Sequence, residues 1–136
     1  MNPKIQDLIK SCNDCIVSCE SGIKSCKNCI KFCKNQACST DIAQDCSVNC
    51  QKIINTCQLC MHKCNQALEH KLYKSPKQEL ALKNCIEACK ESIKRCQTST
   101  QKILDKDTLL GCNWPVDSLN KCISACDECI ESFENE

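Results

Sequence analysis

The amino-acid sequence predicts an all-α protein, folded as an antiparallel up-and-down four-helix bundle with a cysteine-lined core. Only two glycines and three prolines occur among 136 residues, which favours long uninterrupted helices. The cysteines recur mostly at steps of three, four and seven residues, which places them on one face of a helix. No segment of useful length alternates with the period of two that a strand requires. The length suits one domain, which we expect to cover residues 1–136.

The first helix is expected at about residues 4–34. At about 100° per residue, its six cysteines fall within a stripe roughly 100° wide, the width of a core-facing helix surface. Leu8 lies on the same stripe, and Ile16 and Ile23 flank it. Gly22, in the middle of the segment, would allow a slight bend. The six cysteines are Cys12, Cys15, Cys19, Cys26, Cys29 and Cys33.

The second helix is expected at about residues 40–71. A short polar passage at residues 35–40 interrupts the preceding pattern. Ser39, Thr40 or Asp41 can cap the helix that follows, because their side chains accept hydrogen bonds from exposed backbone N–H groups. The cysteines of this segment again form one stripe: Cys46, Cys50, Cys57, Cys60 and Cys64.

The third helix is expected at about residues 76–107. Ser75 suits the N-cap position, Pro76 the first helical position, and Gln78 the third position of a capping box. Its predicted core face consists of Leu82, Cys85, Cys89, Ser92, Cys96, Thr100 and Ile103.

The fourth helix is expected at about residues 115–133. Gly111 would stop the chain segment before it, and Trp114 and Pro115 would begin it. Its predicted core face consists of Leu119, Cys122, Cys126, Cys129 and Phe133. Two cysteines, Cys38 and Cys112, fall outside all four stripes, and we expect them in the loops that join the first to the second and the third to the fourth helix.

Composition limits the possible functions. Nineteen cysteines but only two Phe, one Tyr and one Trp mean that thiols must fill much of the interior. The net charge of +1 is spread along the chain without a basic stripe, which argues against nucleic-acid binding. No apolar run typical of a signal peptide or a membrane span is present, so we expect a cytoplasmic protein, whose thiols stay reduced.

Cysteine pairs three or four residues apart lie on one side of a helix, with Cβ atoms about 5–6 Å apart, and two such thiolates can share one ion. Disulfides fit this pattern poorly: the count is odd, and cysteines on one helix face have nearly parallel Cβ vectors. Bridges between helices stay possible.

Among metals, Cu(I) fits best. Zinc bound by four thiolates leaves a charge of about −2 at each site, which is costly to bury several times over. One Cu(I) per thiolate cancels the charge, and soft thiolates select Cu(I). A zinc-binding protein, or a structural protein with thiols or disulfides, is the alternative.

Catalysis is not expected, so we predict no enzyme. No Cys-Pro pair of the kind common in iron–sulfur motifs is present, and no βαβ pattern surrounds the Cys-x-x-Cys pairs. His62 and His70 are the only imidazoles, and both are expected near the surface. The cysteines instead repeat one unit. Cys-x-x-Cys-x-x-x-Cys occurs at 12–19, 26–33 and 57–64, its reverse at 122–129, and Cys-x-x-x-Cys at 46–50 and 85–89.

These motifs, from Cys12 to Cys129, resemble those of the bacterial four-helix-bundle copper storage proteins, and the absence of a leader resembles the cytosolic branch of that family. The resemblance implies many Cu(I) ions held by thiolates inside each bundle, and a homotetramer. All nineteen cysteines are therefore candidate ligands. The pairs that match the family motif are Cys15/Cys19, Cys29/Cys33, Cys46/Cys50, Cys60/Cys64, Cys85/Cys89 and Cys122/Cys126.

Members of that family also place His or Met near an open end of the bundle. The candidates here are Met61, about 60° from the centre of its cysteine stripe, His62, which points outward, and His70. Cys38 and Cys112 would lie at one pole of an antiparallel bundle. We hypothesise that copper enters at this pole; the alternative is that both are incidental loop thiols.

Overall fold

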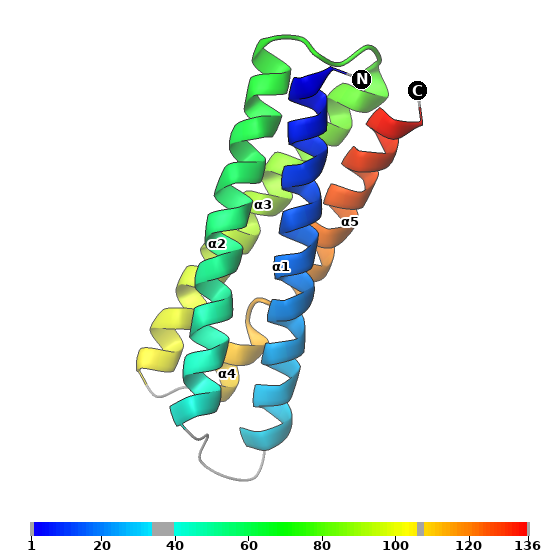
Figure 1. Cartoon of the computed structure of the whole chain (residues 1–136). Helices are drawn as coiled ribbons and strands as arrows, with labels where there is room; N and C mark the ends of the chain where they lie inside the picture. The colour runs from blue at the N-terminus through cyan, green and yellow to red at the C-terminus, as the bar shows by residue number, and fades with distance from the viewer. Residues whose placement is uncertain (1, 34–39, 106–107, 136) are drawn as a thin grey trace.

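The computed structural model describes residues 2–33, 40–105 and 108–135, without the side chains of 32, 33, 40, 42 and 108–110. Over these residues the regular structure is entirely helical, as predicted (Figure 1). Four long helices form the bundle, and one short helix, α4, lies before the last of them. The helices are α1 (Pro3–Cys33), α2 (Thr40–Glu69), α3 (Pro76–Leu104), α4 (Thr108–Asn113) and α5 (Val116–Glu134).

The long helices surround a common core in an up-and-down arrangement. Helix α1 packs against α2 and α5, and α3 packs against the same two helices from the other side. Figure 1 shows α4 at the end of the bundle where α1 finishes and α2 begins, which we call the α4 end. The other end holds the α2–α3 connection and is called the turn end. The predicted antiparallel four-helix bundle is thus confirmed.

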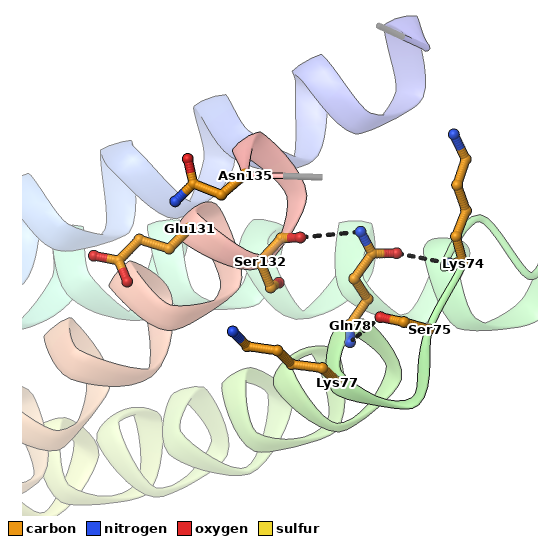
Figure 2. A pocket seen from close by; sticks show the side chains of 7 residues that line it. All are labelled: Lys74, Ser75, Lys77, Gln78, Glu131, Ser132 and Asn135. Atoms are coloured by element: carbon orange, nitrogen blue, oxygen red, sulfur yellow. Dashed lines mark hydrogen bonds between the residues drawn. The ribbon is translucent and has the colours of Figure 1, made fainter.

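The start of α3 confirms the capping motif predicted from the sequence. Ser75 Oγ accepts a hydrogen bond from the backbone N–H of Gln78 at 3.2 Å, and Pro76 occupies the first turn. Gln78 Oε1 accepts from the backbone N–H of Lys74 at 2.6 Å, and its Nε2 donates to the carbonyl of Ser132 in α5 at 3.0 Å. Figure 2 shows this buried glutamine bordering a surface pocket. One side chain therefore caps α3 and joins it to α5.

The connection between α3 and α5 differs from the prediction. Gly111 was expected to stop the preceding segment, but it lies inside α4, and α3 ends earlier, at Leu104. The reason is close packing. A Cβ atom at Gly111 would lie 2.9 Å from Ile103 Cγ1 and 3.0 Å from the carbonyl oxygen of Ser99. Ser99 Oγ in turn donates a hydrogen bond to the carbonyl of Gly111. Glycine therefore lets α4 lie directly on α3.

The core follows the predicted faces closely. Leu8, Leu82 and Leu119 are buried, as are the cysteines around them. On α3 the buried hydroxyls belong to Ser92 and Ser99, whereas the sequence pattern had favoured Thr100 over Ser99. Both serine hydroxyls donate to backbone carbonyls, so neither is a buried polar group without a partner. None of the described helices has an apolar stretch long enough to cross a membrane.

Gly22 marks a close approach between helices. It is buried, and a Cβ atom built on it would overlap Ile53 Cδ1 of α2 and lie 3.5 Å from Leu119 Cδ1 of α5. Its φ is not positive, so a larger residue would meet neighbouring atoms without backbone strain. Packing thus gives this glycine its role.

Substitution at Gly22 tests this contact. We expect Gly22→Ala to destabilise the reduced, metal-free protein by about 1–3 kcal/mol through overpacking, less the gain of about 1 kcal/mol from alanine's helix propensity. Ile53→Val removes the overlapping Cδ1 atom and alone costs about 0.5–1.5 kcal/mol. The double variant should be more stable than the sum of both effects predicts, by about 1 kcal/mol.

Urea denaturation followed by circular dichroism measures these free energies of unfolding. Ile54→Val is the matched control, because Ile54 is also buried on α2 but is not among the atoms nearest Gly22. Its effect should add to that of Gly22→Ala. If the effects of Gly22→Ala and Ile53→Val on the free energy of unfolding were additive as well, the proposed contact between the two residues would be contradicted.

Candidate metal centre

The cysteine side chains form the interior of the bundle. Every cysteine side chain that the structure describes is buried, with at most 1% of its surface exposed. These are all the predicted ligands except Cys33 and Cys38, which lie outside the described side chains. The helical phase of the cysteines therefore predicted this burial correctly at every described position except Cys112, which was expected in a loop.

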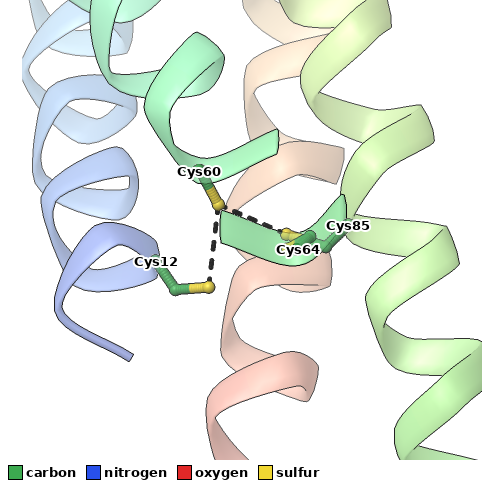
Figure 3. A group of neighbouring side chains, drawn as sticks. All are labelled: Cys12, Cys60, Cys64 and Cys85. Carbon is green, nitrogen blue, oxygen red and sulfur yellow. Dashed lines mark hydrogen bonds between the residues drawn. The ribbon is translucent and has the colours of Figure 1, made fainter. Parts of the chain in front are cut away.

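Sulfur atoms from different helices converge into groups of four. In each of four groups, all sulfur atoms lie within 4.8 Å of one another, and each group draws on three helices. Such groups exist only in the folded bundle. They are Cys12, Cys60, Cys64 and Cys85 (Figure 3); Cys15, Cys89, Cys122 and Cys126; Cys15, Cys19, Cys57 and Cys122; and Cys60, Cys85, Cys89 and Cys126.

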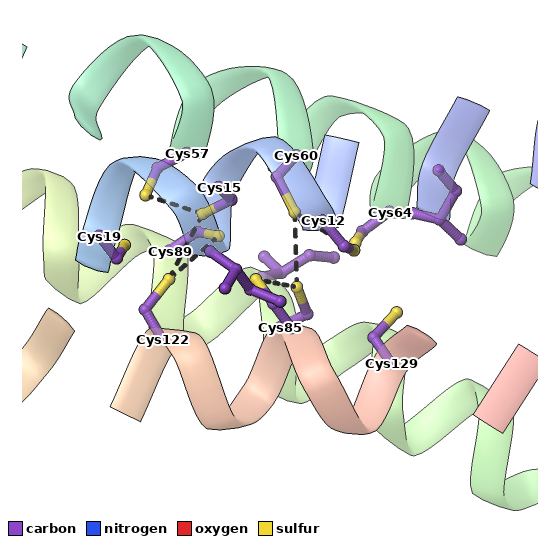
Figure 4. Packing of buried hydrophobic residues seen from close by; sticks show 14 of the residues in the cluster. Cys12, Cys15, Cys19, Cys57, Cys60, Cys64, Cys85, Cys89, Cys122 and Cys129 are labelled. Carbon is purple, nitrogen blue, oxygen red and sulfur yellow. Dashed lines mark hydrogen bonds between the residues drawn. The ribbon is translucent and has the colours of Figure 1, made fainter. Parts of the chain in front are cut away.

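The four groups overlap and follow one another along the bundle. Cys15 and Cys122 belong to two groups, as do Cys89 and Cys126, and so do Cys60 and Cys85. Together the groups contain ten cysteines, which we call the axial sulfur group. They are Cys12, Cys15, Cys19, Cys57, Cys60, Cys64, Cys85, Cys89, Cys122 and Cys126. Figure 4 shows Cys15, Cys57 and Cys122 of this group facing one another across the core.

Neighbouring sulfur atoms within this group are in direct contact. Their separations range from 3.5 to 3.8 Å, the distance of weak thiol–thiol hydrogen bonds. The contacts form two runs that each cross all four long helices. One run joins Cys12, Cys60, Cys85 and Cys126, and the other joins Cys57, Cys15, Cys122 and Cys89.

The thiols differ in acidity because they share hydrogen bonds in a buried space. Hydrogen bonds from Cys12 and then Cys126 lower the pKa of Cys60 to about 7. Hydrogen bonds with Cys122 and Cys126, together with burial, raise the pKa of Cys89 far above its ordinary value of 9.0. A thiolate in this core is stabilised at the expense of the thiols that donate to it. Hydrogen bonds likewise lower the pKa of Cys15, Cys85 and Cys122, whereas the other six thiols of the axial sulfur group have a raised pKa and keep their protons at neutral pH.

A second set of cysteines lies toward the α4 end. Cys26 Sγ of α1 is 3.6 Å from Cys46 Sγ of α2. Cys50 Sγ lies 3.8 Å from the hydroxyl of Ser99, and hydrogen bonds from Cys46 and then Cys96 lower the pKa of Cys50. We call Cys26, Cys46, Cys50 and Cys96 the pole sulfur group. All four side chains are buried.

Cys112 lies elsewhere than predicted. It was expected in a loop, but it is fully buried in α4 and pairs with Cys29 of α1 as a disulfide, with Cα atoms 6.3 Å apart. The bridge joins two helices, the one arrangement that the sequence argument had left open. In this form Cys29 and Cys112 are unavailable as ligands, and reduction would restore them.

The candidate ligands other than cysteine lie at the edge of the sulfur core or outside it. Met61 is half-buried and packs against the core, whereas His62 and His70 are exposed. The outward direction predicted for His62 is therefore confirmed. The residue that the sequence argument missed is Ser99, whose hydroxyl contacts Cys50. A serine at a core position of a helix face is the signal that could have indicated it.

Searches for a matching family model, for similar curated proteins and for similar solved structures found nothing that matches this chain. The likeness to copper storage proteins thus remains a prediction from the cysteine motifs. What the structure itself shows is a helical bundle whose buried cysteine clusters can bind metal ions. The choice of metal has to be argued from the geometry and charge of these clusters.

The acidity of the buried thiols predicts how stability depends on pH. Thiols such as Cys89 and Cys126 have a raised pKa in the folded protein, whereas the same thiols in the unfolded chain ionise near 9.0. Their contribution to stability is complete below that value and is lost as the pH rises toward the folded values. The reduced, metal-free protein should therefore lose about 1.4 kcal/mol of stability per pH unit and per such thiol.

Urea denaturation under reducing, anaerobic conditions at about pH 9.5 and about pH 10.5 measures this loss, because thiols with a lowered pKa are largely ionised in both states there and add little dependence on pH. Cys89→Ser, which removes one raised thiol, should give a shallower dependence on pH. A free energy of unfolding that stays constant or rises over this interval would contradict the protonated core.

Proposed function

We propose that this protein stores Cu(I) in the cytoplasm and limits copper toxicity, by binding many ions through the thiolates inside its bundle. The observation that carries the proposal is the overlap of buried four-sulfur groups along one axis. Among the side chains that the structure describes, fifteen buried cysteines are free thiols, so the number of soft ligands far exceeds what one metal site needs.

The charge of the core is the first reason to propose Cu(I) rather than Zn(II). Each Cu(I) that replaces one thiol proton leaves the net charge of the core unchanged. Each Zn(II) bound by four thiolates would instead leave about −2 in a space shielded from water, where desolvation is costly. A core that holds many ions therefore favours a monovalent one.

The overlap of the four-sulfur groups is the second reason to propose Cu(I). Neighbouring groups share two sulfur atoms each, so no more than two of the four groups can bind separate tetrahedral ions at once. A Cu(I) ion accepts two or three sulfurs, and a thiolate can bridge neighbouring Cu(I) ions. The shared sulfur atoms that limit the number of Zn(II) ions are thus the bridging ligands that a connected Cu(I) cluster requires.

The proposed activity is binding without catalysis. Both histidines are exposed, so neither lies among the buried sulfurs as a proton acceptor. A cytoplasmic location would keep the thiols reduced and ready for metal. By the resemblance of its motifs, we further propose that the bundles assemble as homotetramers.

The number of Cu(I) ions that each chain binds at saturation tests the storage proposal. In an anaerobic titration of the fully reduced protein with Cu(I), we expect more than about ten ions per chain at saturation. The helix content should change little, because the sulfur groups already converge in the metal-free structure. Metal and thiol analysis on the same sample gives the ratio, and circular dichroism gives the helix content. Saturation at one to four Cu(I) would reject storage.

Zinc provides a second test. Because the axial sulfur group offers at most two separate four-sulfur sites, we expect saturation at about two Zn(II) per chain in that group. A structural thiol protein should bind both metals weakly. Four or more tightly bound Zn(II), with Cu(I) saturating at a similar number, would favour the zinc alternative instead.

A further inference from the structure

The column of sulfur atoms is interrupted at one level of the bundle. Three long helices each contain a seven-residue step without cysteine, at 19–26, 50–57 and 89–96, and the first cysteine of α5 is Cys122. Contacts between helices place these steps at one height. On the turn side Cys15 contacts Cys57 and Cys89 contacts Cys122, and on the α4 side Cys26 contacts Cys46. The axial sulfur group lies on the turn side of this level, and the pole sulfur group on the side of α4.

Large apolar side chains occupy this level. Ile53 and Leu119 are both fully buried, and both come close to Gly22 of α1. From α3, Ser92 faces the same level, but its hydroxyl donates to the carbonyl of Ser118 in α5 at 3.2 Å and is thereby engaged. Gly22, Ile53, Ser92 and Leu119 together form what we call the sulfur-free layer. It offers a soft metal ion no ligand.

The contacts among the sulfur atoms follow this division. All four four-sulfur groups lie within the axial sulfur group. Each sulfur–sulfur contact described above joins two cysteines on the same side of the sulfur-free layer. Of the pole sulfur group, Cys26 and Cys46 belong to a buried cluster separate from the main core cluster, whereas Cys50 and Cys96 pack within the main cluster, which also contains Ile53 and Leu119. A chain of bridged ions would thus have to cross a gap without thiolates.

We propose that the pole sulfur group is a second Cu(I)-binding compartment that holds about one ion per thiolate and is separated from the axial sulfur group by Ile53 and Leu119. This inference rests on the proposed copper function and adds that the bundle contains two independent compartments. The pole site has its own ligand pattern: a thiol pair from two helices, Cys26 and Cys46, and a thiol beside a hydroxyl, Cys50 and Ser99. Such pairs suit an ion that accepts two or three ligands.

The independence of the two compartments has a measurable consequence. Because ions bound on opposite sides of the layer share no thiolate, loss of one compartment should leave the other unchanged. Within the axial sulfur group the opposite holds, since six of its cysteines belong to two four-sulfur groups each. Removal of a bridging thiolate there should weaken several neighbouring ions at once.

Two matched quadruple variants test the inference. The pole variant replaces Cys26, Cys46, Cys50 and Cys96 with Ser, and the axial control replaces Cys15, Cys57, Cys89 and Cys122 with Ser. Each removes four buried thiols and keeps the side-chain size nearly constant. The full-length, reduced chains are titrated anaerobically with Cu(I) in competition with a Cu(I)-specific chelator, which reports the number of ions and their affinity.

We expect the pole variant to lose about four Cu(I), while the affinity of its remaining ions changes by less than about twofold. The axial control should lose more ions than it loses thiols, and its remaining axial ions should bind more weakly. If the pole variant fails to fold, the double variant C26S/C46S makes the same test, with a loss of about two Cu(I).

The inference is overturned if the pole substitutions weaken the remaining ions as strongly as the axial substitutions do, or remove no copper at all. Failure of the proposed function has a different signature, because the unaltered protein itself would then saturate at only a few Cu(I). A wild type that binds many ions together with a pole variant that disturbs the axial ions would leave storage intact and refute only the second site.

Discussion

The structure depends on one constraint: a core built from thiols must remain close to electrically neutral. Burial and shared hydrogen bonds keep thiols such as Cys89 and Cys126 protonated. In that form they pack as small apolar side chains, so the bundle can fold without metal. When a monovalent ion replaces each proton, the charge of the core is preserved. The same packing can therefore serve the metal-free and, in our proposal, the copper-loaded protein.

Cysteine side chains are small and would not fill the core alone, so a few large apolar side chains supply the remaining volume. Leu8, Leu82 and Phe133 are buried near the turn end, and Ile53 and Leu119 fill the middle of the bundle over Gly22. These layers lie at the two ends of the axial sulfur group. Large apolar side chains and sulfur ligands thus occupy different levels of the same helices. The seven-residue steps without cysteine in the sequence mark the level at which the apolar side chains pack.

Much of this arrangement follows from the sequence, because the period of an α-helix fixes which residues share a face. The burial of Cys85 and Cys126 was predicted on that basis and is confirmed, and the cap at Ser75 was predicted from its capping motif and is confirmed as well. The contacts between helices were not predictable in the same way, since the axial register that brings Cys12 to Cys60 depends on loops and packing. Gly111 was misassigned because a helix stop and a close helix contact both call for glycine. Cys112 was misplaced with it.

The most direct test of the central claim counts protons rather than metal alone. Calorimetric titration of the reduced protein with Cu(I), in buffers of different ionisation enthalpy near neutral pH, gives the number of protons released per ion bound. A neutral exchange predicts an average of about one proton released per Cu(I) once more than about ten ions are bound. A release well below one proton per ion, or a titration that ends after a few ions, would contradict a protonated thiol core that exchanges its protons for copper.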